Sequence, residues 1–222
     1  MVDSLIKCWL TDMLENKEEF SFDGTWWLPN NVMLQNWFIK RELLQPILDL
    51  YFTTVHNRSI PIHLEFLSYI QAIESYHRRT KKNKILSTEK FCKLKEEILS
   101  LLNEEQKQLV ESKVPFANEP TLNDRLIDIF REYYEFKFFF SIDQDQFIRD
   151  IKNSRNYLTH YTKSLEKKSL KGADLSQATR ILRAILQLLL LLELEFDRDG
   201  INKFTGKIHR WQLDCHSITF KI

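Results

Sequence analysis

Glycine and proline are scarce in this chain, and their scarcity constrains its fold more than any other feature. Together they account for nine of 222 residues, whereas an average chain contains about 12% of the two. β-Sandwiches, barrels and propellers need many tight turns, and tight turns depend on these residues. The composition therefore argues against all-β folds, and with 43% hydrophobic residues it also argues against disorder. We expect an all-α protein made of long helices with few connections.

The spacing of apolar residues predicts where these helices lie. Long helices are expected over 32–55, 62–80, 88–111, 121–140, 143–164 and 176–196. Pro46 either kinks the first of them or starts a new helix. Because the apolar stripes are wide and the connections short, we expect the helices from 62 to 196 to share one core as an antiparallel bundle.

The chain divides into three expected parts. An N-terminal helical extension, 1–58, packs on the bundle, which spans 59–200, and a tail follows over 201–222. The extension includes a short amphipathic helix over 3–17 and an aromatic loop. In that loop Trp26 and Trp27 either pack onto a neighbouring helix, the simpler interpretation, or form a surface on which a sugar or a base stacks. The tail either forms a short strand or packs on the surface of the bundle without regular structure.

Charge and cysteine content limit the classes of function. The net charge of +1 excludes a globally basic nucleic-acid-binding surface but leaves room for a local basic cleft. Cys8, Cys92 and Cys215 are far apart and odd in number, which fits a reducing cytosol better than a disulfide framework or a zinc site. We expect no secretion signal, because the N-terminus lacks a basic stretch followed by an apolar one. The most apolar stretch, 185–194, is half the length of a membrane span, so we expect a buried helix and no membrane.

The segment 143–165 carries two opposite stripes. One face is predicted to contact the core, because apolar or small side chains recur on it at intervals of four and three: Phe147, Ile151, Ser154, Leu158, Tyr161 and Leu165. The other face, about 160° away on a helical wheel, repeats polar side chains at the same intervals: Arg149, Asn153, Asn156, His160 and Lys163. We therefore expect His160 to point away from its own bundle, with Arg155 between the two faces.

This polar face is either an ordinary solvated surface or a site for phosphate chemistry. It combines an imidazole, two amides and several cations, with Lys152 nearby, and has no carboxylate between Asp150 and Glu166. Solubility alone does not require such a bias, and both interpretations stay open at this point. The sequence has no cluster of His, Cys and Asp at metal-ligand spacing, so neither a metal nor a cofactor is expected.

Residues 155–160, RNYLTH, resemble the Arg, polar residue, spacer, His signature of HEPN domains, which are helical bundles that often act as metal-independent ribonucleases. The bare Arg-to-His spacing is a weak signal, since it also occurs at 58–63 and 210–216. Neither of those matches has a long helical context. The match at 155–160 lies in the penultimate long helix, where HEPN domains carry the motif.

More of the chain resembles ApeA-like HEPN proteins. The resemblance rests on Trp37-Phe38, on PILDLY at 46–51 and on FLSYIQAIESYHRR at 66–79, and it covers about 35–196. It implies a bacterial cytoplasmic protein that acts in anti-phage defence by abortive infection. Members of that group usually carry a further N-terminal domain, so the resemblance also implies that a sensor domain is missing from this sequence.

The resemblance implies RNA cleavage by attack of the 2′-hydroxyl on the adjacent phosphate, leaving 2′,3′-cyclic phosphate ends. His160 would act as general acid or base. Arg155 would bind the phosphate and its transition state, and Asn156 would orient His160 or the phosphate. Further RNA contacts are expected from the cations of the same segment: Arg149, Lys152 and Lys163.

One helix alone does not aim both key residues at one phosphate, because Arg155 and His160 lie about 140° apart on an ideal helix. In HEPN proteins a two-fold dimer solves this problem with a composite cleft, so the resemblance implies a homodimer that binds RNA. Glu74 lies on or beside an apolar stripe and either pairs with Arg78 or orients Arg155. His77 and Tyr76 are interpreted as packing residues.

Two other functions stay open at this point. The chain is also consistent with a HEPN module that has lost catalysis and serves dimerisation or binding of RNA or nucleotides. The third alternative is a helical scaffold in which the motif is accidental. Persistent cleavage in EDTA separates the first function from these two.

Overall fold

The computed structural model describes residues 31–57, 59–136, 142–196, 198–199 and 201. The expected helix over 3–17, the Trp26-Trp27 loop and the tail after Ile201 lie outside these residues. Within them, all regular secondary structure is helical, with eight α-helices and one short 3-10 turn. The predicted all-α class is therefore confirmed.

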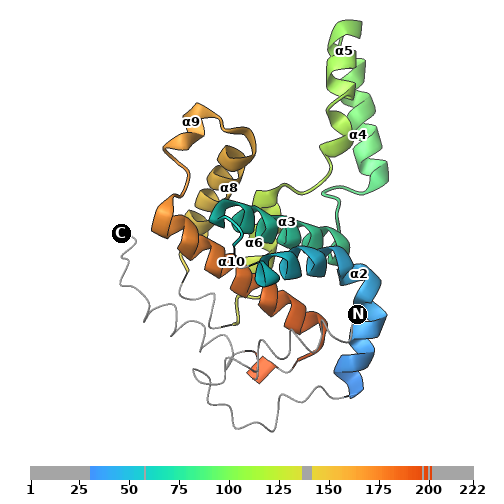
Figure 1. The fold of residues 1–222 in the computed structure, drawn as a ribbon. Helices are drawn as coiled ribbons and strands as arrows, with labels where there is room; N and C mark the ends of the chain where they lie inside the picture. The colour runs from blue at the N-terminus through green and yellow to red at the C-terminus, as the bar shows by residue number, and fades with distance from the viewer. Residues whose placement is uncertain (1–30, 58, 137–141, 197, 200, 202–222) are drawn as a thin grey trace.

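The core forms where α3 (Ile62–Thr80) packs against both α2 (Asn31–His56) and α10 (Gly172–Glu193). Helices α6 (Leu122–Glu132) and α8 (Gln144–His160) pack against each other and against α3. Figure 1 shows α3 in the middle of this arrangement. Helix α10 buries twelve residues along its length, because apolar side chains occupy nearly every side of it.

Helix α10 is also the one described helix that is long and apolar enough to cross a membrane, with a mean hydropathy of 1.4 over its most apolar window. Two thirds of that window is buried inside the protein. The burial is that of a core helix, as the sequence led us to expect for residues 185–194.

Pro46 lies inside α2 and does not divide it. The chain bends there, and Figure 1 shows the two halves of α2 running in different directions. Proline removes one backbone hydrogen bond and clashes with the preceding turn, which explains the bend. The side chain of Pro46 is exposed, so the bend leaves the buried face of α2 continuous.

The expectation of a single helix over 88–111 is wrong. The structure has two helices there, α4 (Thr88–Ser100) and α5 (Glu104–Glu111). Asn103 starts the second helix with a capping box, in which its side chain accepts from the backbone N–H of Gln106 and the Gln106 side chain accepts from the backbone N–H of Asn103. A 3-10 turn, η1 (Val114–Phe116), follows.

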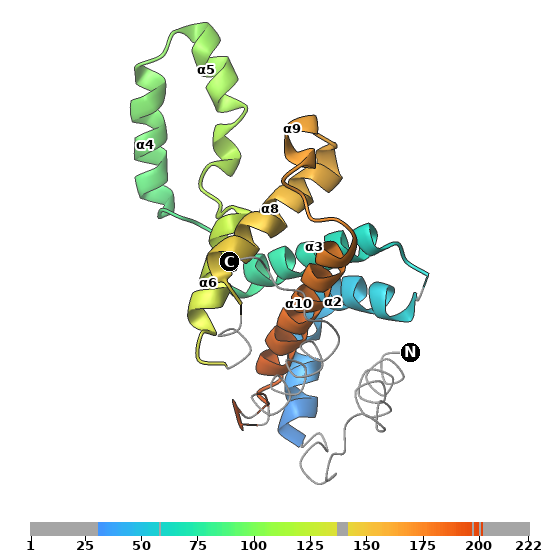
Figure 2. The same cartoon turned by 90° about the vertical axis from the view of Figure 1, so that its left-hand side faces the viewer.

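The expectation that all helices from 62 to 196 share one core is also wrong. Neither α4 nor α5 buries a single residue. Figures 1 and 2 show the two helices as a hairpin that extends away from the bundle. The apolar stripe of α4, with Leu94 and Ile98 exposed, is therefore not used to hold the hairpin against the core.

Three helix ends differ from the expected ones. Helix α6 stops at Glu132 instead of near 140, and α8 stops at His160 instead of 164. Helix α10 begins at Gly172, four residues before the expected start, and neither Asp174 nor Ser176 caps it. Its buried stripe already begins at Leu175, so the helix must start early enough to present that side chain to the core.

Candidate active site

Helix α8 carries the predicted site. The Asp143 side chain caps its start by accepting a hydrogen bond from the backbone N–H of Gln146 at 3.0 Å. The residues that α8 buries against the core are Phe147, Ile148, Ile151 and Ser154. The hydroxyl of Ser154 also accepts a hydrogen bond from the backbone N–H of Leu170 at 2.8 Å. This bond fastens the loop before α10 onto α8.

His160 is the last residue of α8. Tyr161 follows in the left-handed conformation, with φ of 50°, and its N–H donates to the carbonyl oxygen of Tyr157. The expected core stripe is wrong at this point, because Tyr161 is exposed. The left-handed residue ends the helix, so Lys163 lies on the separate short helix α9 (Lys163–Glu166) and is not part of the polar face of α8.

Arg155 contacts a carboxylate from another helix. One guanidinium nitrogen lies 3.7 Å from Oε2 of Glu74 on α3, and the other terminal nitrogen donates to Oδ1 of Asn156 at 3.3 Å. The side chain of Arg155 remains 34% exposed. Of the two expected partners of Glu74, the structure brings Arg155 to it, whereas Arg78 forms an ion pair with Glu119 at 2.9 Å.

The remaining predicted residues lie along α8. His160 and Arg149 are exposed, and Asn156 and Lys152 are half-buried. Within the described part of the chain, the side-chain contact of Asn156 is with Arg155 and not with His160. The structure thus groups Glu74, Arg155 and Asn156 and leaves the His160 imidazole open to solvent at the helix end.

A cavity of about 510 Å³ opens beside this helix. It lies between α8 and the segment that joins α9 to α10, and its lining includes four basic side chains: Arg149, Lys167, Lys168 and Lys171. Asn153 also lines it and precedes Asn156 and His160 by three and seven residues, so all three share one helix face. At 1.5 Å of rise per residue, the cavity begins about 10 Å along α8 from His160.

Carboxylates offset part of this positive charge. The cavity is also lined by Asp150, Glu166 and Asp174, and Lys171 lies 3.6 Å from Oε1 of Glu166. No three His, Cys, Asp or Glu side chains among the described residues are placed to hold a metal ion.

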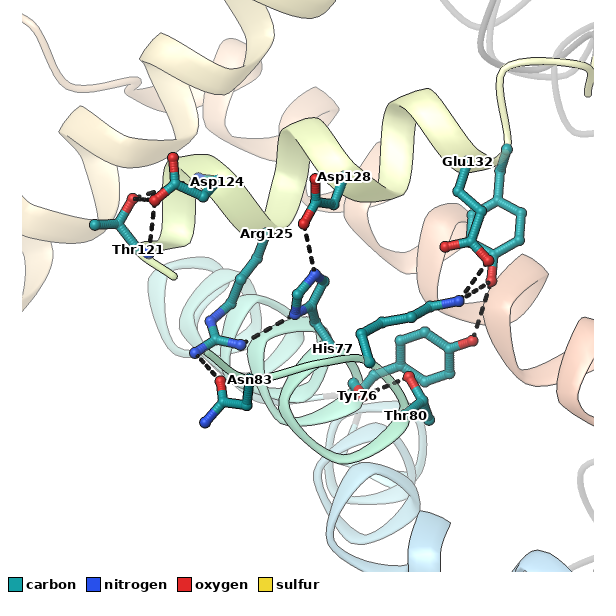
Figure 3. Close-up of polar contacts among 11 residues, drawn as sticks. Tyr76, His77, Thr80, Asn83, Thr121, Asp124, Arg125, Asp128 and Glu132 are labelled. Atoms are coloured by element: carbon teal, nitrogen blue, oxygen red, sulfur yellow. Dashed lines mark hydrogen bonds and ion pairs between the residues drawn. The ribbon is translucent and has the colours of Figure 1, made fainter. Parts of the chain in front are cut away.

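A second polar cluster lies between α3 and α6 and was not predicted from the sequence. Arg125 is buried, with 1% of its surface exposed. Its guanidinium donates to Nδ1 of His77 at 3.0 Å and to Oδ1 of Asn83 at 2.7 Å, and Glu119 lies 3.9 Å away. Figure 3 shows the Arg125 and His77 side chains meeting between the two helices.

The contacts of Arg125 fix the tautomer of His77. A guanidinium only donates hydrogen bonds, so Nδ1 of His77 is the unprotonated acceptor. Nε2 then carries the proton and donates it to Oδ2 of Asp128 at 3.3 Å. Burial lowers the pKa of His77, and the Arg125 and Lys81 cations lower it further against the opposing effect of Asp128. His77 is therefore buried, as expected, but as a neutral hydrogen-bonded group.

The cluster is linked to the candidate site through Glu74. Burial lowers the pKa of Arg125, as does the Arg78 cation, while the Glu74 carboxylate raises it. Glu74 thus stabilises two guanidinium groups, one in the buried cluster and one on α8. The sequence does contain a signal for the cluster, because Arg125 falls on the apolar stripe of α6 between Leu122 and Leu126.

The neutral state of His77 predicts a pH dependence of stability. The unfolded chain binds a proton at this side chain near pH 6.5, above the folded pKa, so its stabilising contribution is present above that pH and is lost as the pH falls below it. As the pH is lowered below about 6.5, we expect the free energy of unfolding to fall more steeply for the wild type than for His77→Asn. The two slopes should differ by up to about 1.4 kcal/mol per pH unit. Urea unfolding between pH 5 and 8 measures both slopes, and equal slopes would contradict the assignment.

A comparison with known protein families shows which family this chain belongs to. The family model described as Apea-like HEPN matches residues 67–200. The chain belongs to this family. The match spans α3 to α10 and contains every residue of the candidate site. No curated protein and no solved structure matches the chain. Membership in the Apea-like HEPN family confirms the resemblance seen in the sequence and indicates a ribonuclease-type or defence-associated function.

Proposed function

We propose that this chain is an endoribonuclease that cleaves RNA without a metal ion and acts in the bacterial cytoplasm as the effector of a phage-defence or toxin system. The observation that carries the proposal is the arrangement at the end of α8. Arg155 is held by Glu74 of α3 and contacts Asn156, and His160 stands exposed one turn beyond Asn156. This arrangement occurs in a chain of the Apea-like HEPN family.

The proposed reaction needs two proton transfers. The 2′-oxygen of one nucleotide attacks the adjacent phosphorus, the bond from phosphorus to the 5′-oxygen breaks, and a 2′,3′-cyclic phosphate results. The 2′-hydroxyl loses a proton and the leaving 5′-oxygen gains one. His160 performs one of these transfers, since an imidazole titrates near neutral pH and this one is accessible to an RNA chain.

Arg155 is proposed to stabilise charge on the phosphoryl oxygens. Its guanidinium forms a planar fork that suits phosphate, and the contacts of its two terminal nitrogens with Glu74 and Asn156 orient that fork. A partly exposed guanidinium with a fixed orientation loses little entropy when it binds an anion. Because Arg155 and His160 lie about 140° apart on α8, we propose a two-fold dimer in which each copy supplies part of the cleft.

Incubation of the purified chain with total RNA and with transfer RNA in the presence of EDTA tests the function. We expect cleavage that leaves 2′,3′-cyclic phosphate ends, read by their resistance to 3′ ligation until the ring is opened and the resulting phosphate is removed. No cleavage at any protein concentration would instead favour a non-catalytic dimerisation or RNA-binding module. Cleavage that EDTA abolishes would contradict the metal-independent mechanism.

The basic cavity is proposed to bind RNA phosphates next to the cleavage site. We expect the triple substitution of Lys167, Lys168 and Lys171 by glutamine, made in the His160→Ala chain so that RNA stays intact, to weaken binding of single-stranded RNA. The slope of log affinity against log salt should fall in magnitude by up to about 2, since each lost phosphate contact removes about 0.7. Fluorescence anisotropy at several salt concentrations measures this slope.

A charge-matched control separates this effect from a change in net charge. Lys82, Lys93 and Lys113 are exposed and lie outside the cavity lining. Their triple substitution by glutamine removes the same charge, so we expect a smaller change in slope. If both triple variants change the slope equally, the cavity is not an RNA site.

A further inference from the structure

Tyr161 is an exposed aromatic residue to which the cleavage mechanism gives no role. Its side chain is 64% exposed, and it directly follows His160, the proposed acid or base. Its backbone is left-handed, with φ of 50°. Helices commonly end in this conformation, but the residue is usually glycine, because a β-carbon is disfavoured there. Ending the helix therefore does not account for the large ring, and residues held in such conformations cluster at functional sites.

Tyr157 supports the ring of Tyr161. The two ring centroids lie 5.6 Å apart with an angle of 64° between the ring planes, an edge-to-face arrangement that is favourable for aromatic pairs. Tyr157 is half-buried on α8, whereas most of Tyr161 is open to solvent. Whichever ring supplies the edge, Tyr157 leaves at least one face of Tyr161 uncovered. The pair therefore presents an oriented aromatic face beside His160.

The charges around this aromatic face favour an anionic ligand. The sequence from Arg155 to Lys163 contains these two cations and His160 and no carboxylate. Both His160 and Lys163 are exposed, and the basic cavity begins about 10 Å along α8. The next carboxylate in the chain, that of Glu166, lies 3.6 Å from Lys171. An exposed aromatic ring among cations is the combination with which proteins bind single-stranded nucleic acid, since bases stack on the ring and phosphates contact the cations.

We propose that Tyr161 stacks on an unpaired nucleobase next to the phosphate that is cleaved. The inference rests on the proposed ribonuclease function for the position of that base. It extends the function by naming the substrate class, which is RNA that is single-stranded at the cleavage site. In a duplex the neighbouring bases cover both faces of each base, so an aromatic side chain can stack only on bases that are unpaired and splayed out.

Fluorescence anisotropy with two oligomers of equal length tests the stacking. The first is a short oligoadenylate, and the second is the same ribose–phosphate backbone without bases. Both are bound to the His160→Ala chain, so that RNA stays intact. We expect Tyr161→Leu in this chain to weaken oligoadenylate binding by about tenfold, the usual scale for one stacked base. The oligomer without bases should bind with unchanged affinity, because its phosphate contacts remain.

The variant is designed to leave the backbone as it is. Leucine also carries a β-carbon, so Tyr161→Leu does not change the cost of the left-handed conformation, and circular dichroism checks the fold. Tyr161→Phe keeps the ring and should retain most of the affinity for oligoadenylate. Tyr134, in the segment after α6, is 57% exposed. Tyr134→Leu therefore removes an exposed tyrosine elsewhere and should change neither affinity.

Different results overturn this inference and the ribonuclease proposal. If Tyr161→Leu weakens binding of both oligomers equally, or of neither, Tyr161 does not stack on a base, even where the wild type cleaves RNA in EDTA. A loss confined to oligoadenylate would support the stacking even where the wild type cleaves no RNA, and the chain would then be an RNA-binding module.

Two further results would also exclude the proposal. The first is an equal loss of affinity for a double-stranded RNA, which would contradict the single-stranded substrate class. The second is weaker self-association of the Tyr161→Leu chain in sedimentation equilibrium with unchanged oligoadenylate affinity. That result would assign the ring to a contact between two copies of the chain.

Discussion

Substitution of His160 by alanine is expected to lower kcat/KM for RNA cleavage by at least about 100-fold, the usual contribution of a general acid or base. The fold should be unaffected, because the imidazole is exposed and no described side chain depends on it for a hydrogen bond. We expect the free energy of unfolding to change by less than about 1 kcal/mol, mainly through the lost interaction of a histidine with the helix C-terminus.

His56 provides a matched control for this experiment. It is also an exposed histidine at the last position of a helix, α2. Because its ring stacks on Phe52, His56→Ala should cost at least as much stability as His160→Ala and cause no change in cleavage. A kinetic assay with a fluorescent RNA, combined with urea unfolding, measures both quantities. A His160→Ala chain that cleaves at the wild-type rate would exclude the proposed mechanism.

Substitution of Arg125 by alanine is expected to destabilise the protein by about 3–5 kcal/mol, the cost of removing one partner from a buried charged network. The change leaves Nδ1 of His77 and Oδ1 of Asn83 without their donor and opens a cavity. A loss of this size is a large part of the stability of an ordinary domain, and we expect the Tm to fall by roughly 10 °C.

Arg125→Met separates the polar contribution from packing. Methionine fills most of the same volume without donating hydrogen bonds, so a loss intermediate between wild type and Arg125→Ala is expected. Arg131 lies on the same helix and is exposed, so Arg131→Ala should be nearly neutral. Thermal unfolding followed by circular dichroism measures all three variants. A loss below about 1 kcal/mol for Arg125→Ala would show that the buried network does not stabilise the fold.

Helix bounds were predicted well from the sequence where helix-breaking residues lie at both ends of a continuous apolar stripe. Helix α3 has the expected bounds, since Pro61 and the lysine-rich turn after Thr80 enclose one continuous stripe. The expectation over 88–111 failed because the periodicity there continues across Asn103. The capping box of Asn103 and Gln106 is a local signal that marks the break.

The position of the α4–α5 hairpin outside the core was not predictable from the spacing of its apolar residues. An amphipathic pattern predicts a helix with one apolar face, but it does not indicate whether that face packs against the core. The candidate site shows the same limit. The helix with Arg155 and His160 was predictable, and the choice between Arg78 and Arg155 as the partner of Glu74 needed the three-dimensional packing of α3 against α8. The burial of Arg125 was not predictable from the sequence, because arginine is almost never fully buried unless it is paired. Its partners His77 and Asn83 are more than 40 residues away in the chain.

The separation of the hairpin from the bundle has an evolutionary consequence. No hairpin residue contributes to the buried core, and none of the site residues lies on α4 or α5. Substitutions in the hairpin can therefore accumulate without altering the chemistry, whereas α8 is constrained from both sides by the core and by the site. Sequence change in the hairpin is therefore expected to be tolerated by the fold, whereas most changes on α8 affect either the core or the candidate site.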